Sequence, residues 1–263
     1  MNIKSRSIYN KYLKTVEMSA KSLTNGGTVY LFASYLLKIV YLAPLLLLWR
    51  TLANDGADIG MPLSKMLTYT YLGALFSEML VVRTPACNWF YEGLFISLYQ
   101  RPSGILADLA AQAVGGWMPQ LLLFSLPMVI AAPLFGVSMT IYSVWFFPSL
   151  ILCISLGFAI DYLFACLAIR LNNTSWLVYV IRMAVVSLLS GSVIPFSVLP
   201  GNIGIIFQYM PMGSLAGAPL SIYTGLAEPT SIIAVQLLWN IVLWPTAIFI
   251  FRKSSERMVS YGG

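Results

Sequence analysis

Charged residues are scarce in this sequence: Asp, Glu, Lys and Arg make up 9% of the 263 residues, whereas 59% are hydrophobic. A soluble globular domain carries roughly 25% charged residues, so this chain has too few polar groups to cover a globule in water. The composition excludes soluble, disordered and fibrous proteins. It predicts an integral membrane protein.

Histidine is absent and only three cysteines, Cys87, Cys153 and Cys166, are present. Without histidine, zinc–imidazole sites and Ser–His or Cys–His catalytic pairs are excluded. Three scattered cysteines are too few for a disulfide framework or a thiolate metal site. Phosphate-loop, dinucleotide-binding, zinc-protease and kinase motifs are also missing. We therefore expect no catalytic residue, metal or cofactor in this chain, and no ATP hydrolysis by the chain alone.

What the sequence does contain is a series of apolar stretches. A helix needs about 20 apolar residues to cross a bilayer, and six stretches meet or approach that length. They are residues 29–53, 63–82, a part of 106–134, a part of 142–170, 176–189 and 231–251. The sequence thus predicts an all-α membrane protein with about six transmembrane helices, in which residues 28–263 form the transmembrane domain.

Positive charge is concentrated on one side of this predicted arrangement. Five Lys or Arg residues precede the first stretch and three follow the last, whereas the connections 54–62, 135–141 and 191–230 contain none. By the positive-inside rule, both termini are expected to be cytoplasmic. The net charge of +6 then reports orientation in a plasma membrane, such as the bacterial inner membrane, and not a nucleic-acid partner.

Residues 1–27 predict an amphipathic helix. One face carries Ile8, Tyr9, Tyr12, Leu13, Val16, Ala20 and Leu23, and the other carries Lys11, Lys14, Glu17 and Lys21. Such a helix is expected to lie in the inner headgroup layer, with its lysines towards anionic lipid. Two roles stay open: a plain anchor, or a moving elbow that leads into the first span. Tryptophans near span ends, Trp49, Trp145 and Trp176, are expected to be interfacial anchors.

Residues 190–230 cannot form one continuous helix. Glycines and prolines interrupt the stretch, among them Gly191, Pro195, Pro200, Gly201, Pro211 and Pro219. Its other residues are largely apolar, and broken backbone at membrane depth is tolerated only when it is buried in protein or lines a cavity. The sequence therefore predicts re-entrant half-helices on the outer side. The alternative is an external hairpin that lies on the surface.

A second irregular region, residues 83–103, lies on the predicted cytoplasmic side. Apolar residues such as Trp89, Phe90, Leu94 and Phe95 are bounded there by prolines, which predicts a short amphipathic helix. That helix either rests on lipid or docks into a groove of a partner.

Four ionisable residues fall within the inner halves of the predicted spans: Lys38, Glu78, Asp161 and Arg182. Charges at such positions are costly and therefore informative. They are expected to pair with one another across helices or to extend towards the inner interface. The alternative is a role in a proton or substrate path.

Three segments together resemble the ABC type-2 permease family, the membrane subunits of a class of ATP-binding-cassette exporters. The most specific is SGSVIPFSVLPGNIGIIFQYMPMGSLAGAPLSIYTG at 190–225; the others are YEGLFISLYQRP at 91–102 and the Leu-Trp-Arg at 48–50. The first is similar to the glycine- and proline-rich stretch between the fifth and sixth spans of the family. Met212 departs from it, because the family more often has an aromatic residue there.

The resemblance implies a permease that forms a dimer with an identical or homologous chain and binds a separate ATPase, which holds ATP and Mg. It implies that residues 190–225 close the outer side. It also implies a coupling helix that docks on the ATPase, built from Trp89, Phe90, Tyr91, Glu92, Gly93, Leu94, Phe95 and Arg101. The expected cargo is a hydrophobic or amphipathic compound: a drug, peptide or lipid-like molecule.

Two other functions stay open from the residues alone. A gradient-driven secondary transporter would show inverted repeats and carboxylates at matching depth, and the two halves of this chain show no such similarity. A membrane-embedded enzyme acting on lipid would need a polar catalytic cluster at the interface, for which a chain without histidine offers few candidates.

Overall fold

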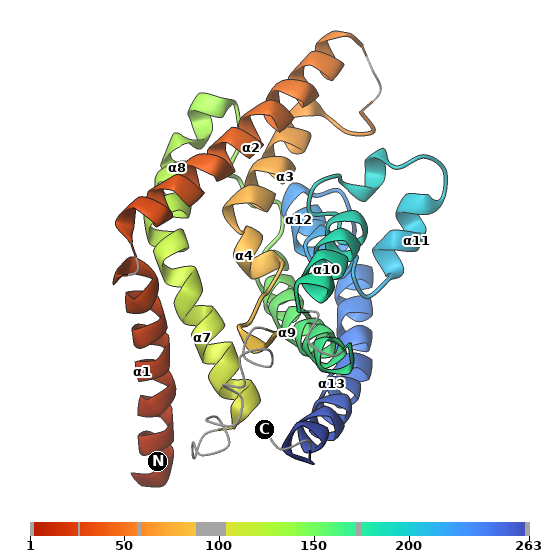
Figure 1. Cartoon of the computed structure of the whole chain (residues 1–263). Coiled ribbons are helices and arrows are strands. Elements are labelled where there is room, and N and C mark those ends of the chain that lie inside the picture. Colours follow the sequence, from red (N-terminus) through yellow and green to blue (C-terminus); the bar gives the residue numbers. More distant parts are fainter. Residues whose placement is uncertain (1–2, 26, 57–58, 88–103, 172–174, 261–263) are drawn as a thin grey trace.

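The computed structural model describes residues 3–25, 27–56, 59–87, 104–171 and 175–260, and these ranges are helical and contain no strand (Figure 1). The helices of the first half are α1 (Ile3–Asn25), α2 (Thr28–Asn54), α3 (Leu63–Leu75), α4 (Ser77–Leu80), α7 (Ile105–Gln120), the π-helical turn η1 (Leu121–Ser125), α8 (Leu126–Ala131) and the 3₁₀ turn η2 (Ala132–Phe135). Those of the second half are α9 (Phe146–Arg170), α10 (Ser175–Leu189), the 3₁₀ turn η3 (Phe196–Val198), α11 (Ile203–Tyr209), α12 (Gly217–Thr224) and α13 (Pro229–Ser260).

Four helical stretches are long and apolar enough to cross a membrane. They are α2, the continuous run from α7 to η2, α9, and α13 up to residue 254. At 1.5 Å per residue, the 27 residues of α2 extend about 40 Å, which exceeds the roughly 30 Å of a hydrocarbon core. The second and fifth predicted stretches form shorter helices, because α3 has 13 residues and α10 has 15.

The stretch predicted as one helix over 63–82 is in fact broken at Phe76, between α3 and α4. A buried carbonyl that has no partner within its own helix needs another donor, and α7 and η1 supply donors here. The carbonyl of Leu75 accepts hydrogen bonds from Gln120 Nε2 at 3.2 Å and from Ser125 Oγ at 2.8 Å. Two side chains from a neighbouring helix thus stabilise the break. The length of the apolar stretch in the sequence does not reveal this break.

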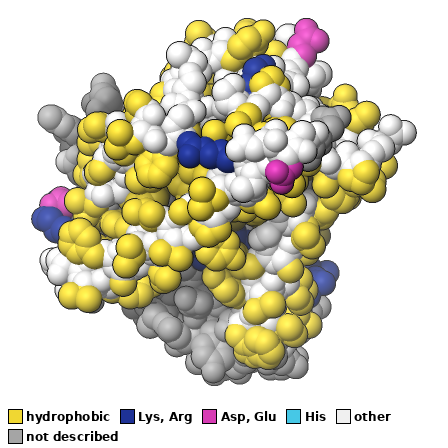
Figure 2. Space-filling model, turned by 90° about the horizontal axis from the view of Figure 1, so that it is seen from above, with side chains coloured by type: hydrophobic (Ala, Val, Ile, Leu, Met, Phe, Trp, Pro, Cys, Tyr) yellow, Lys and Arg dark blue, Asp and Glu magenta, His cyan; other side chains and the backbone are white. Residues whose placement is uncertain are grey.

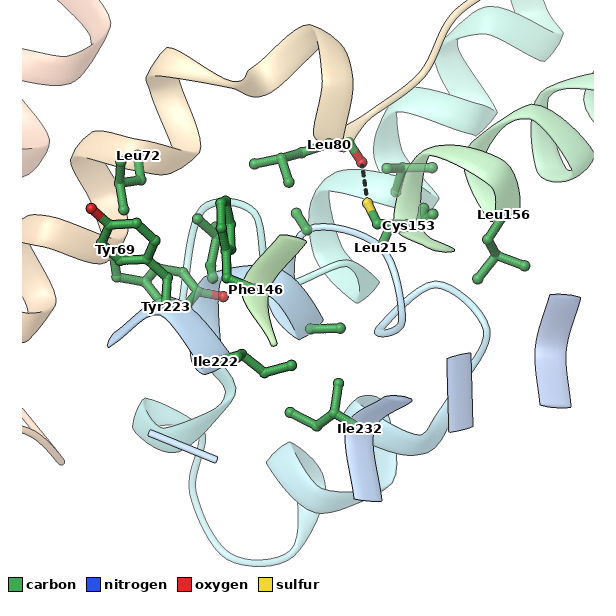
Figure 3. Close-up of a cluster of buried hydrophobic side chains, with 14 of the residues drawn as sticks. Tyr69, Leu72, Leu80, Phe146, Cys153, Leu156, Leu215, Ile222, Tyr223 and Ile232 are labelled. Atoms are coloured by element: carbon green, nitrogen blue, oxygen red, sulfur yellow. Dashed lines mark hydrogen bonds between the residues drawn. The ribbon is translucent and has the colours of Figure 1, made fainter. Parts of the chain in front are cut away.

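Helix α9 lies at the centre of the fold. It packs along α13 and against α12 and α10 (Figure 1). The most apolar window of α9 is 56% buried, against 22% for α2 and 17% for α13. A cluster of buried side chains joins α9 to α3, α4 and α12, and Cys153 of α9 lies beside Leu80 of α4 in it (Figure 3). Helices α2 and α13 therefore leave most of their apolar surface outside the protein core, as lipid-facing helices do.

Helix α1 lies alongside α7 (Figure 1). Thr15 Oγ1 donates to Asp108 Oδ1 at 3.2 Å, and Ser19 Oγ donates to the carbonyl of Gln112 at 2.7 Å. A Cβ at Gly115 would lie 2.4 Å from the backbone oxygen of Val16, so glycine is what allows this approach.

The face of α1 that contacts α7 thus includes Thr15 and Ser19, which lie outside the predicted apolar face. From that apolar face, Tyr9 and Leu13 remain 60% and 49% exposed. On the opposite face, Lys21 Nζ lies 2.6 Å from Glu17 Oε1 and its hydrogen bond lowers the pKa of that carboxyl. Helix α7 therefore covers part of α1, a contact that the amphipathic pattern of residues 1–27 does not indicate.

The short elements η3, α11 and α12 lie towards the end of the molecule opposite the start of α1 and the end of α13 (Figure 1). Seen from that end, the surface is mostly hydrophobic or uncharged, with a few isolated charges (Figure 2). The expected interfacial role of Trp49 is wrong, because its side chain is 5% exposed and packs in a core cluster with Leu46 and Ile59. Trp145 and Trp176 are exposed, as the prediction requires.

Candidate functional site

A cavity of about 380 Å³ lies between α2, the α3–α4 segment and α10. Much of its wall is apolar, with Leu42 and Leu45 from α2 and Val186 from α10. Lys38, Glu78 and Arg83 add charged groups to the same wall. The cavity therefore combines an apolar lining with a small charged cluster, which is the usual character of a small-molecule site.

The charged cluster consists of one carboxylate held between two cations. Lys38 Nζ lies 3.1 Å from Glu78 Oε1, and Arg83 Nη2 lies 3.3 Å from Glu78 Oε2. The side chains of Lys38 and Glu78 are 26% and 27% exposed, and that of Arg83 is 39% exposed. All three groups can therefore be reached from outside the protein core.

Further contacts fix the position of Lys38. Its ammonium group donates to Gln120 Oε1 at 2.5 Å and lies 5.9 Å from the centre of the Phe124 ring. The amide nitrogen of Gln120 donates in turn to the carbonyl of Leu75 at the helix break. Lys38 is the eleventh residue of α2, about 15 Å from its start at 1.5 Å per residue. A cation at that depth needs such partners, because desolvation penalises its charge.

A second charged cluster, next to the first, is more deeply buried. Arg182 Nη2 lies 3.1 Å from Asp161 Oδ1, and the two side chains are 7% and 6% exposed. Asp161 Oδ2 also accepts from the backbone N–H of Thr84 at 2.9 Å and from the Thr84 hydroxyl. Arg182 donates to the carbonyl of Val82. This pair therefore secures the extended chain after α4 to both α9 and α10.

The four intramembrane charges predicted from sequence are thus brought together as two pairs, Lys38 with Glu78 and Asp161 with Arg182. Sequence reasoning did not single out Arg83, which joins the first of these pairs. It also missed Gln120, Thr84 and Tyr179, the last of which accepts a hydrogen bond from Arg83 Nη1 at 3.1 Å. A polar Gln120 inside an apolar stretch was the one local signal for part of this network.

The glycines and prolines of the segment that the resemblance predicts to close the outer side lie between the end of α10 and α12. We call them the outer gate residues: Gly191, Pro195, Pro200, Gly201, Pro211 and Pro219. Gly191 has φ +68° and its carbonyl accepts from the hydroxyl of Tyr69 at 2.6 Å. A Cβ at Gly217 would lie 2.4 Å from the ring of Phe196, so this close contact requires glycine. Pro219 lies inside α12 and does not interrupt a helix there, because the first turn needs no intrahelical donor from it.

The remaining predicted gate residues are distributed differently. Pro195 is buried before η3, Pro200 and Gly201 are exposed between η3 and α11, and Pro211 is half-buried after α11. A second cavity of about 270 Å³ lies among η3, α11 and α12. The predicted coupling residues, Trp89, Phe90, Tyr91, Glu92, Gly93, Leu94, Phe95 and Arg101, lie outside the described residues.

The side chains around this cavity can bind and orient a ligand. Over the described ranges, no group of three or more His, Cys, Asp or Glu is arranged to hold a metal ion. The cavity offers cations, hydroxyls and apolar surface, which together can hold and orient an amphipathic molecule. The sequence matches no known family model and has no significant match among curated proteins.

Proposed function

We propose that this chain is the transmembrane subunit of an ATP-binding-cassette exporter, located in a plasma membrane such as the bacterial inner membrane. The observation that carries the proposal is the cavity of about 380 Å³, whose charged lining includes Lys38, about 15 Å along the membrane-length helix α2. A cavity at that depth suits a molecule in passage across the bilayer. The resemblance of residues 91–102 and 190–225 to the ABC type-2 permease family is the basis for proposing transport driven by a separate ATPase.

The proposed topology has six spans: α2, the α3–α4 segment, α7 to η2, α9, α10 and α13, with both termini cytoplasmic. Support comes from the Lys and Arg distribution and from the burial of α3. Residues 66–73 of α3 are all buried, so a short, interrupted helix at that place is surrounded by protein, as broken backbone in a membrane must be. On the opposite side, η3, α11 and α12 form re-entrant elements that close the outer end.

The proposed mechanism is alternating access or lateral entry at an interface between two permease chains. Exposed apolar residues flank the cavity: Tyr41 on α2 is 79% exposed and Leu188 on α10 is 73% exposed. A second chain, identical or homologous, would cover these faces and enclose the cavity. The partner ATPase would drive the change by making different contacts with the coupling region in its two states.

The test is copurification of the tagged chain from its native membrane. A bound ATPase is expected, and Glu92→Lys or Gly93→Trp should uncouple ATP hydrolysis from export while the permease stays folded. Glu228→Lys is the matched control, because it reverses a charge at an exposed position just before α13, on the proposed outer side. It should change neither the binding of the ATPase nor the coupling of ATP hydrolysis to export.

Unchanged export by both coupling variants at equal membrane abundance would contradict the docking assignment. Transport by the chain alone in proteoliposomes, driven only by an ion gradient, would replace the proposal with a secondary transporter.

A further inference from the structure

We infer that the cavity between α2, α3–α4 and α10 binds an amphipathic molecule with a single negative charge, a carboxylate or a phosphodiester on an apolar chain. As a statement about the exported cargo, this inference rests on the proposed function. As a statement about binding, it depends only on the residues of this chain.

The charges around the cavity do not balance. Among the described residues, Lys38, Arg83 and Arg182 face two carboxylates, Glu78 and Asp161. Asp161 and Arg182 satisfy each other away from solvent, which leaves Glu78 shared between two cations that both line the cavity. One positive charge therefore remains at the cavity wall. An anionic group of a ligand is the natural complement, because the side chains of Lys38 and Arg83 remain 26% and 39% exposed and can therefore pair with it.

A buried hydroxyl in the same wall also points to a ligand. Thr70 is 4% exposed, lines the cavity, and its Oγ1 has no hydrogen-bond partner among the described residues. Buried polar groups are normally satisfied. Thr70 lies about two helical turns from Ser77 by residue count, away from the charged end. It marks a place for a second hydrogen-bonding group of the ligand, such as an ester oxygen.

The rest of the wall suits an apolar chain. Leu42, Leu45 and Val186 line it, and a volume of about 380 Å³ falls within the roughly 300–1,000 Å³ typical of small-molecule sites. A dianion would exceed the one available positive charge, and a cation would meet an excess of like charge. The monoanionic amphipath is therefore the ligand class that matches both the charge and the lining.

The test is equilibrium binding to the full chain in nanodiscs of zwitterionic phosphatidylcholine, with protein-free nanodiscs subtracted. The probes share one alkyl chain and differ in charge: dodecanoate, dodecylphosphocholine and dodecylamine. Dodecanoate is expected to bind saturably, with one site per chain, and the zwitterion and the amine at least tenfold more weakly. Phosphatidylglycerol serves as competitor, since its displacement of dodecanoate identifies a bilayer lipid as the source of the anion, whereas no displacement identifies a single-chain amphipath.

Two variants remove one cation each while leaving Glu78 paired with the other. Lys38→Met and Arg83→Gln should each weaken dodecanoate binding at least tenfold, equivalent to about 1.4 kcal/mol, and Glu78→Gln should strengthen it. Lys65→Met is the control, because this half-buried lysine on α3 contacts the Gly225 carbonyl and Tyr142 and does not line the cavity.

Equal binding of dodecylamine and dodecanoate would overturn the inference, as would dodecanoate affinities in Lys38→Met and Arg83→Gln that match the control. Since no partner is needed, the result is separable from the exporter proposal. Dodecanoate binding without a copurifying ATPase would contradict the exporter proposal and support the binding site. A copurifying ATPase without dodecanoate binding would contradict the binding site alone.

Discussion

The buried Asp161–Arg182 pair gives the sharpest test of how this fold is held together. In Asp161→Leu, Arg182 keeps its hydrogen bond to the Val82 carbonyl but loses its counter-charge. Breaking a buried ion pair from one side typically costs about 3–5 kcal/mol. In Arg182→Met, the carboxylate keeps two donors from Thr84, so the cost should lie at the lower end of that range.

The double variant Asp161→Leu/Arg182→Met removes both charges and leaves apolar side chains of similar size. What remains is the N–H of Thr84 without its acceptor and the carbonyl of Val82 without its donor, each of which costs about 1–3 kcal/mol. The double variant should therefore cost less than the sum of the two single variants, because it leaves no uncompensated charge and well-packed apolar residues often replace a buried ion pair without loss.

The assay is equilibrium unfolding by SDS in mixed micelles, followed by tryptophan fluorescence. Glu17→Gln is the control, because the Glu17–Lys21 pair is 61% and 67% exposed and its loss should leave the unfolding midpoint unchanged. If the costs of the two single variants simply add in the double variant, the two charges do not stabilise each other and the reasoning is refuted.

Two further predictions concern helix contacts. Gly115→Leu should separate α1 from α7, because its Cβ alone would lie 2.4 Å from the backbone oxygen of Val16. Faster amide hydrogen exchange in α1 would show this separation. Gly116→Ala is the control, because its Cβ would make only a 3.6 Å contact and should leave the exchange rate unchanged. Tyr69→Phe removes the hydroxyl that donates to the carbonyl of Gly191 at 2.6 Å and should cost about 1–3 kcal/mol in the same SDS titration. An unchanged midpoint would show that this carbonyl finds another donor.

The deviations from plain helices have a common physical basis. Between α3 and Thr84 the chain is helical only over the short α4, and side chains donate hydrogen bonds to carbonyls of this segment. Gln120 and Ser125 donate to the carbonyl of Leu75, and Cys153 Sγ lies 3.7 Å from that of Leu80 (Figure 3). Each donor belongs to another helix. The irregular segment that lines the cavity therefore exists only because α7 and α9 supply its hydrogen bonds.

The sequence by itself determined where the helices lie. Each predicted stretch corresponds to one observed helix or to a run of consecutive helical elements, because helix formation in an apolar setting depends on local hydropathy and run length. Helix α2 begins and ends within one residue of the stretch at 29–53, and α9 lies within the predicted region 142–170, whereas α13 continues nine residues beyond the predicted end at 251. The four costly charges were also evident, since a charge within an apolar run stands out without knowledge of its neighbours.

Only the tertiary structure decided which groups meet. Lys38 and Glu78 are 40 residues apart in sequence, and Lys38 and Gln120 are 82 apart, so no local pattern could pair them. The break at Phe76 and the contact of α1 with α7 likewise depend on partners from distant helices. The physical reason is that hydropathy is a property of a segment, whereas hydrogen bonds and ion pairs at membrane depth depend on which segments become neighbours, and that is settled only when the helices pack.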